Sequence, residues 1–162
     1  MVEVDKRALI AELCAELSRS IAVLHRAAGE AREAATHEES RPENDKDTRA
    51  VEAAYLAGAQ ADRVRELTRT TAALASLDLK SFGPGTPISS SALVELEHEG
   101  VTTAYFVAPQ GGGMRATVGG VTVQVLTPQS ALGRELLGKT AGDVIEVTVQ
   151  GRRREYEIVG VA

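Results

Sequence analysis

Residues 5–35 read DKRALIAELCAELSRSIAVLHRAAGEAREAA, a run rich in the helix-forming residues Ala, Leu, Glu and Arg. Its apolar and small residues recur three or four positions apart, which places them on one face of a helix with about 3.6 residues per turn. This first stripe consists of Leu9, Leu13, Leu17, Ile21, Leu24, Ala28, Ala31 and Ala35. A second stripe consists of Val51, Ala54, Gly58, Ala61, Val64, Leu67, Thr71 and Leu74. Because charges occupy the opposite faces, we predict two helices packed along their stripes.

The segment between the two stripes, residues 37–47, is short and polar. A short connection makes neighbouring helices antiparallel, so we predict a coiled-coil hairpin with arms of about 30 residues, each roughly 45 Å long. Near the connection, small residues dominate, and we expect them to let the helices approach closely and keep that end slender. These residues are Ala27, Ala28, Ala31, Ala34, Ala35, Ala53, Ala54, Ala57 and Gly58.

The composition changes near residues 79–87, where glycine and proline interrupt the helical pattern. Runs of β-branched or alternating residues then predict strands over residues 92–96, 102–107, 121–126, 144–149 and 156–161. A short helix is expected at residues 131–137, between Ser130 and Gly138. The sequence therefore predicts a two-domain α+β protein, with a helical hairpin in residues 1–79 and a small antiparallel sheet carrying one helix in residues 80–162.

The formal net charge of −5 argues against a protein whose main affinity comes from neutralising nucleic-acid phosphates, and it fits a protein partner better. We expect no specific DNA sequence to be recognised. No apolar run is long enough for a membrane span and no signal peptide is evident, so we expect a cytoplasmic protein that does not bind membranes. Cys14 is the single cysteine and the three histidines lie far apart, which argues against a disulfide or a zinc site.

Five carboxylates fall within residues 38–47, at the predicted tip of the hairpin. Carboxylate oxygens are the ligands that Mg²⁺ prefers, and Mg²⁺ commonly shares one or two protein carboxylates with water and other groups. We therefore take Glu38, Glu39, Glu43 and Asp45 as candidate metal-facing acids. A structural alternative remains open, because Ser40 and Glu43 have the spacing of a capping box at the start of the second helix.

Two further motifs have both a functional and a structural interpretation. Arg152, Arg153 and Arg154 form the densest basic run and could contact nucleic acid, but charges at the start of an edge strand also block edge-to-edge pairing. Residues 111–113 are three glycines that could surround a phosphate, although no Lys-Ser or Lys-Thr follows them. We favour the structural interpretation of both motifs.

Residues 127–147 read TPQSALGRELLGKTAGDVIEV, and this order of a Ser-x-Leu-Gly segment, Leu-Leu-Gly-Lys, Gly-Asp and a strand resembles the signature of the Gre (GreA/GreB) transcription elongation factors. Glu43-Asn44 followed by Ala53-Ala54-Tyr55 resembles the tip region of that family, with extra residues between. The chain departs from the family pattern in three places. Ser40 stands where the family has an acidic residue, Ala131 stands where it has proline, and residues 115–120 lack the acidic residues that the family has in this loop.

The resemblance implies a C-terminal domain of FKBP-like fold that docks at the secondary channel of bacterial RNA polymerase, with Ser130, Ala131, Leu132 and Gly133 as the docking segment. It also implies a hairpin that enters the channel, where Glu39 and Glu43 at the tip would serve as the catalytic acids. These acids would help hold the Mg²⁺ of the polymerase while the polymerase cleaves its own backtracked transcript. The protein would then be a cofactor of polymerase rather than an enzyme, with no cofactor of its own and only indirect contact with nascent RNA.

Three alternatives remain at the level of the sequence. The first is a regulator that occupies the channel without stimulating cleavage. The second is a peptidyl-prolyl isomerase, suggested by the FKBP-like fold but disfavoured because only 3% of residues are aromatic. The third is a structural coiled-coil adaptor whose binding does not depend on the tip acids.

Overall fold

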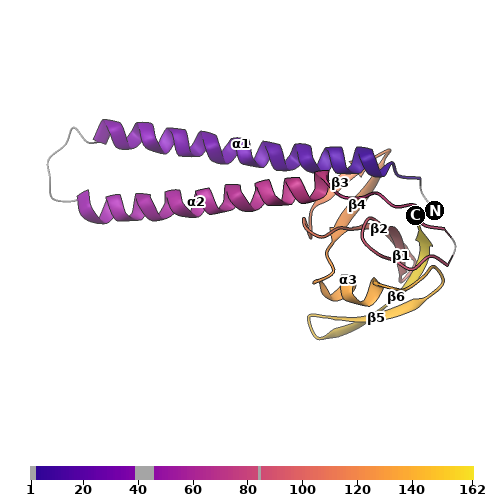
Figure 1. Cartoon of the computed structure of the whole chain (residues 1–162). Helices are drawn as coiled ribbons and strands as arrows, with labels where there is room; N and C mark the ends of the chain where they lie inside the picture. Colours follow the sequence, from indigo (N-terminus) through magenta and orange to yellow (C-terminus); the bar gives the residue numbers. More distant parts are fainter. Residues whose placement is uncertain (1–2, 39–45, 84) are drawn as a thin grey trace. The chain divides into compact units, whose positions relative to one another are not determined.

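The computed structural model of the chain describes residues 3–38, 46–83 and 85–162, with side chains for all of these except residues 35–38 and 46–49. Two long helices precede a sheet that carries a short third helix (Figure 1). By its contacts the chain divides into two compact units: Ala15–Thr71, and Met1–Cys14 together with Ala72–Ala162. The boundary between residues 79 and 80 stays a proposal about where two independently folding segments meet.

The helical hairpin consists of α1, Lys6–Glu38, and α2, Lys46–Ala75, which run antiparallel (Figure 1). Asp5 caps the first turn of α1, because its Oδ1 accepts hydrogen bonds from the backbone N–H of Arg7 at 2.8 Å and of Ala8 at 3.4 Å. The prediction of an antiparallel pair of long helices is therefore confirmed.

Burial along the hairpin decreases toward the connection between the helices. Ile21, Leu24 and Val64, further along the predicted stripes, are only half-buried, and no side chain described in residues 18–34 or 50–66 is buried. Only the parts of the predicted stripes that lie at the end of the hairpin away from this connection form a buried face. The buried stripe residues are Leu9, Leu13, Leu17, Leu67 and Leu74.

The predicted close packing of small residues is wrong for the residues that the structure describes. Ala27 and Ala28 are half-buried, whereas the other alanines of this set with described side chains are exposed. A Cβ atom added to Gly58 would meet no other atom within 4 Å. The physical reason is that a methyl group buries too little apolar surface to hold two helices in contact. The larger neighbours Val51, Tyr55 and Leu56 are 69%, 79% and 61% exposed.

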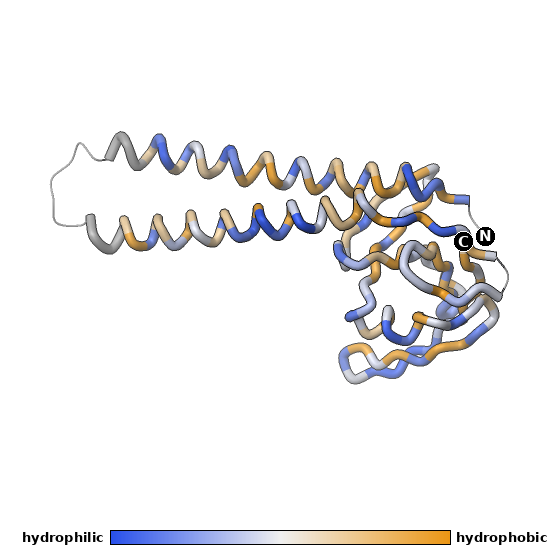
Figure 2. Tube along the Cα trace, viewed as in Figure 1, coloured by the Kyte–Doolittle hydropathy of each residue, from blue (hydrophilic) through white to orange (hydrophobic). Residues whose placement is uncertain are grey.

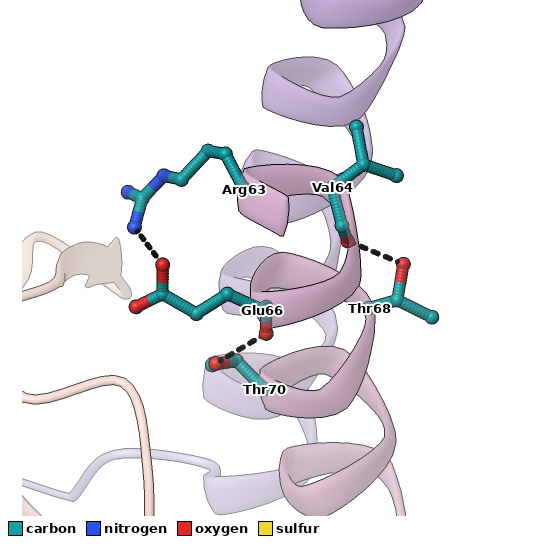
Figure 3. A network of polar contacts seen from close by, with 5 residues as sticks. All are labelled: Arg63, Val64, Glu66, Thr68 and Thr70. Atoms are coloured by element: carbon teal, nitrogen blue, oxygen red, sulfur yellow. Dashed lines mark hydrogen bonds and ion pairs between the residues drawn. The ribbon is translucent and has the colours of Figure 1, made fainter. Parts of the chain in front are cut away.

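Several polar contacts of α2 are local to that helix. Arg63 Nη1 lies 2.7 Å from Glu66 Oε2, and Arg65 pairs with Asp62 one turn earlier. The hydroxyls of Thr68 and Thr70 donate back to carbonyl oxygens four residues before them, at 2.8 and 3.1 Å (Figure 3). Exposed ion pairs of this kind contribute only about 0.3–0.5 kcal/mol each. They therefore do not make up for the lack of buried apolar contacts in this part of the hairpin.

Hydrophilic and hydrophobic residues alternate along both long helices in Figure 2, without a continuous apolar block. None of the helices in the described part of the chain combines the length and the apolar character that crossing a membrane requires.

A six-stranded sheet, in the order β3-β4-β2-β1-β6-β5, forms the second half of the chain. The five predicted strands are present, and a strand that the sequence did not predict, β3, pairs with β4 at one edge. β3 has only four residues, and the turn Gly119-Gly120, with φ of 59° and 82°, connects it to β4. The strands are β1 Leu93–His98, β2 Val101–Val107, β3 Arg115–Val118, β4 Val121–Leu126, β5 Val144–Val149 and β6 Arg152–Val161.

The sheet is mixed rather than wholly antiparallel. β2 and β4 are parallel, with Ala104 opposite Val123 and Val107 opposite Leu126, while β1 pairs antiparallel with both β2 and β6. β3 comes between β2 and β4 in the sequence but lies on the far side of β4 in the sheet. The chain therefore first crosses to the sheet edge, and β4 then runs back between β3 and β2. The predicted small sheet with one helix is confirmed. The pairing of β2 with β4 is parallel, however, whereas the sequence predicted an antiparallel sheet.

A hydrophobic core lies between the sheet and α3, Ala131–Leu136. Leu136 and Ile158 are fully buried in this core, and Leu132, Tyr105 and Tyr156 pack against it while remaining partly exposed. The opposite face of the sheet also holds buried residues, among them Phe106 and Val123. Both faces of the central strands are therefore covered.

The prediction that Arg152, Arg153 and Arg154 begin an edge strand needs correction. β6 lies between β1 and β5, so it is an internal strand of the sheet. Its partner β1, however, pairs only with residues 157–161, and the three arginines pair with β5 alone. The basic run thus occupies the part of β6 that lacks a second neighbouring strand.

The segment between α2 and β1 is fixed to the first turn of α1. Lys6 Nζ donates to the carbonyl oxygen of Lys80 at 2.7 Å and lies 4.7 Å from the centre of the Phe82 ring. Lys80 N–H in turn donates to Ser91 Oγ at 2.9 Å. Burial lowers the pKa of Lys6. These contacts hold the segment between α2 and β1 against Lys6 of α1 on one side and Ser91 on the other.

Candidate functional site

The predicted acidic tip falls mostly outside the described residues. Glu39, Glu43 and Asp45 lie there, as does Ser40 of the proposed capping box, and Glu38 is the last residue of α1 with no described side chain. Within the described ranges, no group of three or more His, Cys, Asp or Glu side chains could hold a metal ion. The metal-facing role of the tip acids therefore stays a prediction.

The predicted docking segment begins with Ser130, which caps α3. Its side-chain oxygen accepts the N–H of Gly133 at 3.0 Å and donates to the carbonyl oxygen of Thr127 at 2.8 Å. The guanidinium of Arg134 donates to the carbonyl oxygen of Gln129 at 2.9 Å. These three hydrogen bonds hold the loop before α3 against the helix, so the segment has a fixed shape.

Gly133 packs too closely against the preceding loop to be replaced by any other residue without rearrangement. A Cβ atom at this position would overlap the carbonyl oxygen of Thr127 and would lie 2.8 Å from Ser130 Oγ. The glycine therefore allows α3 to lie against its own N-terminal loop. This packing explains why serine and glycine stand three residues apart in the motif.

The end of α3 and the turn into β5 are held by a second group of backbone contacts. Gly138, with φ of 79°, follows the C-cap, and its N–H donates to the carbonyl oxygen of Ile88 at 2.9 Å. Asp143 Oδ2 accepts the backbone N–H of Thr140 at 2.8 Å and its hydroxyl at 3.2 Å. The hydrogen bond from the Thr140 backbone holds the pKa of Asp143 below its ordinary value.

The four residues of the docking segment thus have different roles in the fold. Ser130 and Gly133 build the cap, and Leu132 packs against the core. Ala131 is exposed at the start of α3, and Leu137, just after the helix, is 39% exposed. Ala131 and Leu137 thus leave apolar surface exposed next to α3, and the sequence analysis did not single out Leu137.

Comparison with known proteins gives a family for the C-terminal part of the chain. Residues 116–162 match the family model described as transcription elongation factor, GreA/GreB, C-term. This segment contains α3, its cap, the Asp143 turn and strands β4 to β6. No curated protein sequence matches the chain.

Several solved structures resemble the chain weakly over most of its length. A structure of the transcription factor Gfh1 has 20% identity and a TM-score of 0.41, with 93% of both chains covered. GreA factor homolog 1 (Gfh1) of Thermus thermophilus has 19% identity and a TM-score of 0.40, with 92% of this chain and 94% of that chain covered. A GreA/GreB elongation factor from Nitrosomonas europaea has 21% identity and a TM-score of 0.37, with 59% and 78% covered.

The family model matches the segment in which Ser130 and Gly133 cap α3 and Gly138 and Asp143 form the turn after it. The family assignment of this segment rests on that match and not on the weak structural likenesses. Residues 116–162 of this chain are thus similar to the C-terminal part of the GreA/GreB transcription elongation factors.

Proposed function

We propose that this protein binds RNA polymerase through the surface around α3 and that the acidic tip of its hairpin acts at the polymerase active site to promote cleavage of backtracked transcripts. The observation that supports docking is the α3 cap, in which Ser130 and Gly133 fix the loop and leave Ala131 and Leu137 accessible. The protein would act as a cofactor of polymerase and not as an enzyme in its own right.

The residues proposed for the tip fit the chemistry of a shared Mg²⁺ ion. All four are carboxylates, which supply the hard oxygen ligands that Mg²⁺ takes. Such an ion, when bound, activates water for attack on a phosphodiester. The part of this chain would be to add oxygen ligands and negative charge at the site that polymerase provides.

A second candidate function is a factor that occupies the channel without stimulating cleavage. Ser40 favours it, because this residue stands where the resemblance expects an acid three positions before Glu43. A serine hydroxyl is a weaker ligand for Mg²⁺ than a carboxylate. With one acid fewer at the tip, the hairpin would enter the polymerase without completing the metal site.

Transcript cleavage in a backtracked polymerase complex distinguishes the two candidates. We compare the wild type with a Glu39→Ala/Glu43→Ala variant and with a matched Glu30→Ala/Glu33→Ala variant, whose acids lie exposed on the body of α1. Cleavage that is faster with the wild type, unaffected by the α1 variant and lost in the tip variant supports the cleavage role. Binding with unchanged or slower cleavage supports the channel-occupying role.

Docking is tested separately by binding to polymerase. A Leu137→Glu variant should bind more weakly, because it places a charge on the exposed surface after α3. The control is Val159→Glu, since Val159 is 43% exposed on β6 and Leu137 is 39% exposed. Equal affinities of the two variants would contradict docking through α3.

A further inference from the structure

Three consecutive glycines form a fixed loop between β2 and β3. Gly111 and Gly113 have φ angles of 85° and 86°, in the left-handed region that favours glycine, whereas Gly112 lies outside that region. The N–H of Gly113 donates to the carbonyl oxygen of Val125 on β4 at 2.9 Å, which attaches the loop to the sheet. Backbone angles therefore account for two of the three glycines, and a plain turn would not need the one at position 112.

Gly112 packs against the side chain of Thr127, which follows β4. A Cβ atom at position 112 would lie 3.0 Å from Cγ2 and 3.3 Å from Oγ1 of Thr127. The first distance is well below the optimum of about 3.5–4.0 Å between carbon atoms. Rotation about χ1 would not relieve the overlap, because each staggered position of a β-branched side chain leaves a heavy atom in at least one of the two close contacts. Any side chain at position 112 would therefore displace Thr127 itself.

The backbone of Thr127 supports the cap of α3. Its carbonyl oxygen accepts the backbone N–H of Ser130 at 3.1 Å and the hydroxyl of Ser130 at 2.8 Å. The same oxygen fills the space that a Cβ atom on Gly133 would need, and Ser130 Oγ accepts the N–H of Gly133 at 3.0 Å. A displacement of Thr127 would thus be transmitted to Ser130 and Gly133, the first and last residues of the docking segment.

We propose that Gly112 is a positioning residue for docking: by leaving room for the Thr127 side chain, it holds residues 130–133 in the shape that binds the partner. The inference rests on the proposed docking through α3 and adds to it a loop that precedes the helix by about 20 residues in the sequence. Gly112 acts through Thr127, so it needs no contact of its own with the partner.

The test measures the affinity of the full chain for bacterial RNA polymerase. We expect Gly112→Ala to weaken binding by about tenfold or more, the scale on which overpacking shifts an equilibrium constant. The control is Gly83→Ala, since Gly83 also lies in a loop and the nearest atom that an added Cβ would meet among the described residues is Thr86 Oγ1, at 3.9 Å. Gly83→Ala should bind like the wild type, and equal affinities of the two variants would overturn the proposal.

A rescue variant separates positioning from a general loss of stability. Thr127→Ser keeps the backbone carbonyl that Ser130 requires but removes Cγ2, so the remaining hydroxyl can rotate away from an added Cβ. We expect the Gly112→Ala/Thr127→Ser variant to bind polymerase nearly as tightly as Thr127→Ser alone, which is the non-additivity of two residues in direct contact. A double variant that binds as weakly as Gly112→Ala would overturn the route through Thr127.

The amide signals of the ¹⁵N-labelled chain report the geometry without polymerase, at a temperature where circular dichroism shows every variant to be folded. Gly112→Ala should shift the signals of Ser130 and Gly133, and Gly83→Ala should leave them in place. If the wild type binds polymerase but Gly112→Ala moves neither signal, the positioning role fails and docking through α3 stands. If the signals move but the wild type does not bind polymerase, the proposed docking fails and the positioning role fails with it.

Discussion

Gly133 illustrates how a single residue controls the geometry of the docking segment. It is buried, and the space that a side chain would need is filled by the carbonyl group of Thr127 and by Ser130 Oγ. Backbone atoms cannot move aside as the end of a flexible side chain can. The glycine is thus required by packing and not by an unusual backbone dihedral angle.

We expect Gly133→Ala to lower the free energy of unfolding by about 3 kcal/mol or more, the upper range for overpacking a well-packed site. The matched control is Gly29→Ala, since Gly29 lies within α1 and an added Cβ would meet nothing within 4 Å. This control should stabilise the protein by about 0.5–1 kcal/mol, because alanine favours a helix. Urea unfolding measures both, and a Gly133→Ala variant as stable as the wild type would contradict the packing argument.

Asp143 provides a prediction on pH dependence. Its pKa in the folded protein lies below the ordinary value of 3.8, because the charged form accepts the N–H of Thr140. Its contribution to stability is therefore fully present above about pH 4 and is lost as the pH falls through the lowered pKa. Asp143→Asn should melt at a lower temperature than the wild type at pH 7, and the difference should shrink at acidic pH. A difference that persists unchanged at pH 2 would contradict this account.

At the scale of elements, the hairpin combines a well-buried end with an exposed one. Leu67 and Leu74 of α2 are 7% and 0% exposed, whereas Val51, Tyr55 and Leu56 are more than half exposed. A helix without a buried face depends on its intrinsic propensity, which is marginal in water. Local stability should therefore differ along α2.

Hydrogen exchange tests this difference. We expect the backbone amides of residues 51–59 to exchange much faster than those of residues 67–74, because the former open without exposing buried apolar surface. A Leu56→Ala variant should leave the melting temperature nearly unchanged. Leu74→Ala, in contrast, should cost about 2–5 kcal/mol. Uniform protection along α2 would contradict the burial pattern.

The same elements show what the sequence can predict. The spacing of Leu9, Leu13 and Leu17 predicted α1, because helical periodicity is a local property of the sequence. It could not predict that Ala31 and Gly58 stay exposed, since that depends on the distance between two helices. The four residues of β3 were too short a run to be recognised, and the parallel pairing of β2 with β4 follows from a register that no local pattern contains. The predicted tip acids remain untested.

For the molecule as a whole, the division into compact units affects how the chain can be shortened. Leu9, Leu13 and Leu74 are completely buried and belong to the unit that contains the sheet, although they come from the two long helices. This feature could not be read from neighbouring residues.

We expect a fragment of residues 80–162 to be less stable than a chain in which residues 18–66 are replaced by a short Gly-Ser linker. The second variant retains the buried leucines at the base of both helices, and the fragment lacks them. Removing the five buried leucines Leu9, Leu13, Leu17, Leu67 and Leu74 should cost several kcal/mol, since each contributes about 1.5–3 kcal/mol. Thermal unfolding followed by circular dichroism compares the two, and equal stability would instead support folding of residues 80–162 on their own.

The position of β6 between β1 and β5 has a consequence for folding during synthesis. β5 leaves the ribosome before β6, but it has no neighbour in the sheet until residues 152–157 have been made. β1 waits longer for the same strand, because its partners are residues 157–161. The sheet is therefore completed late, and until then the nascent chain carries β1 with one unpaired edge. Such an edge can pair with another chain, so a chaperone that binds at this stage would prevent aggregation.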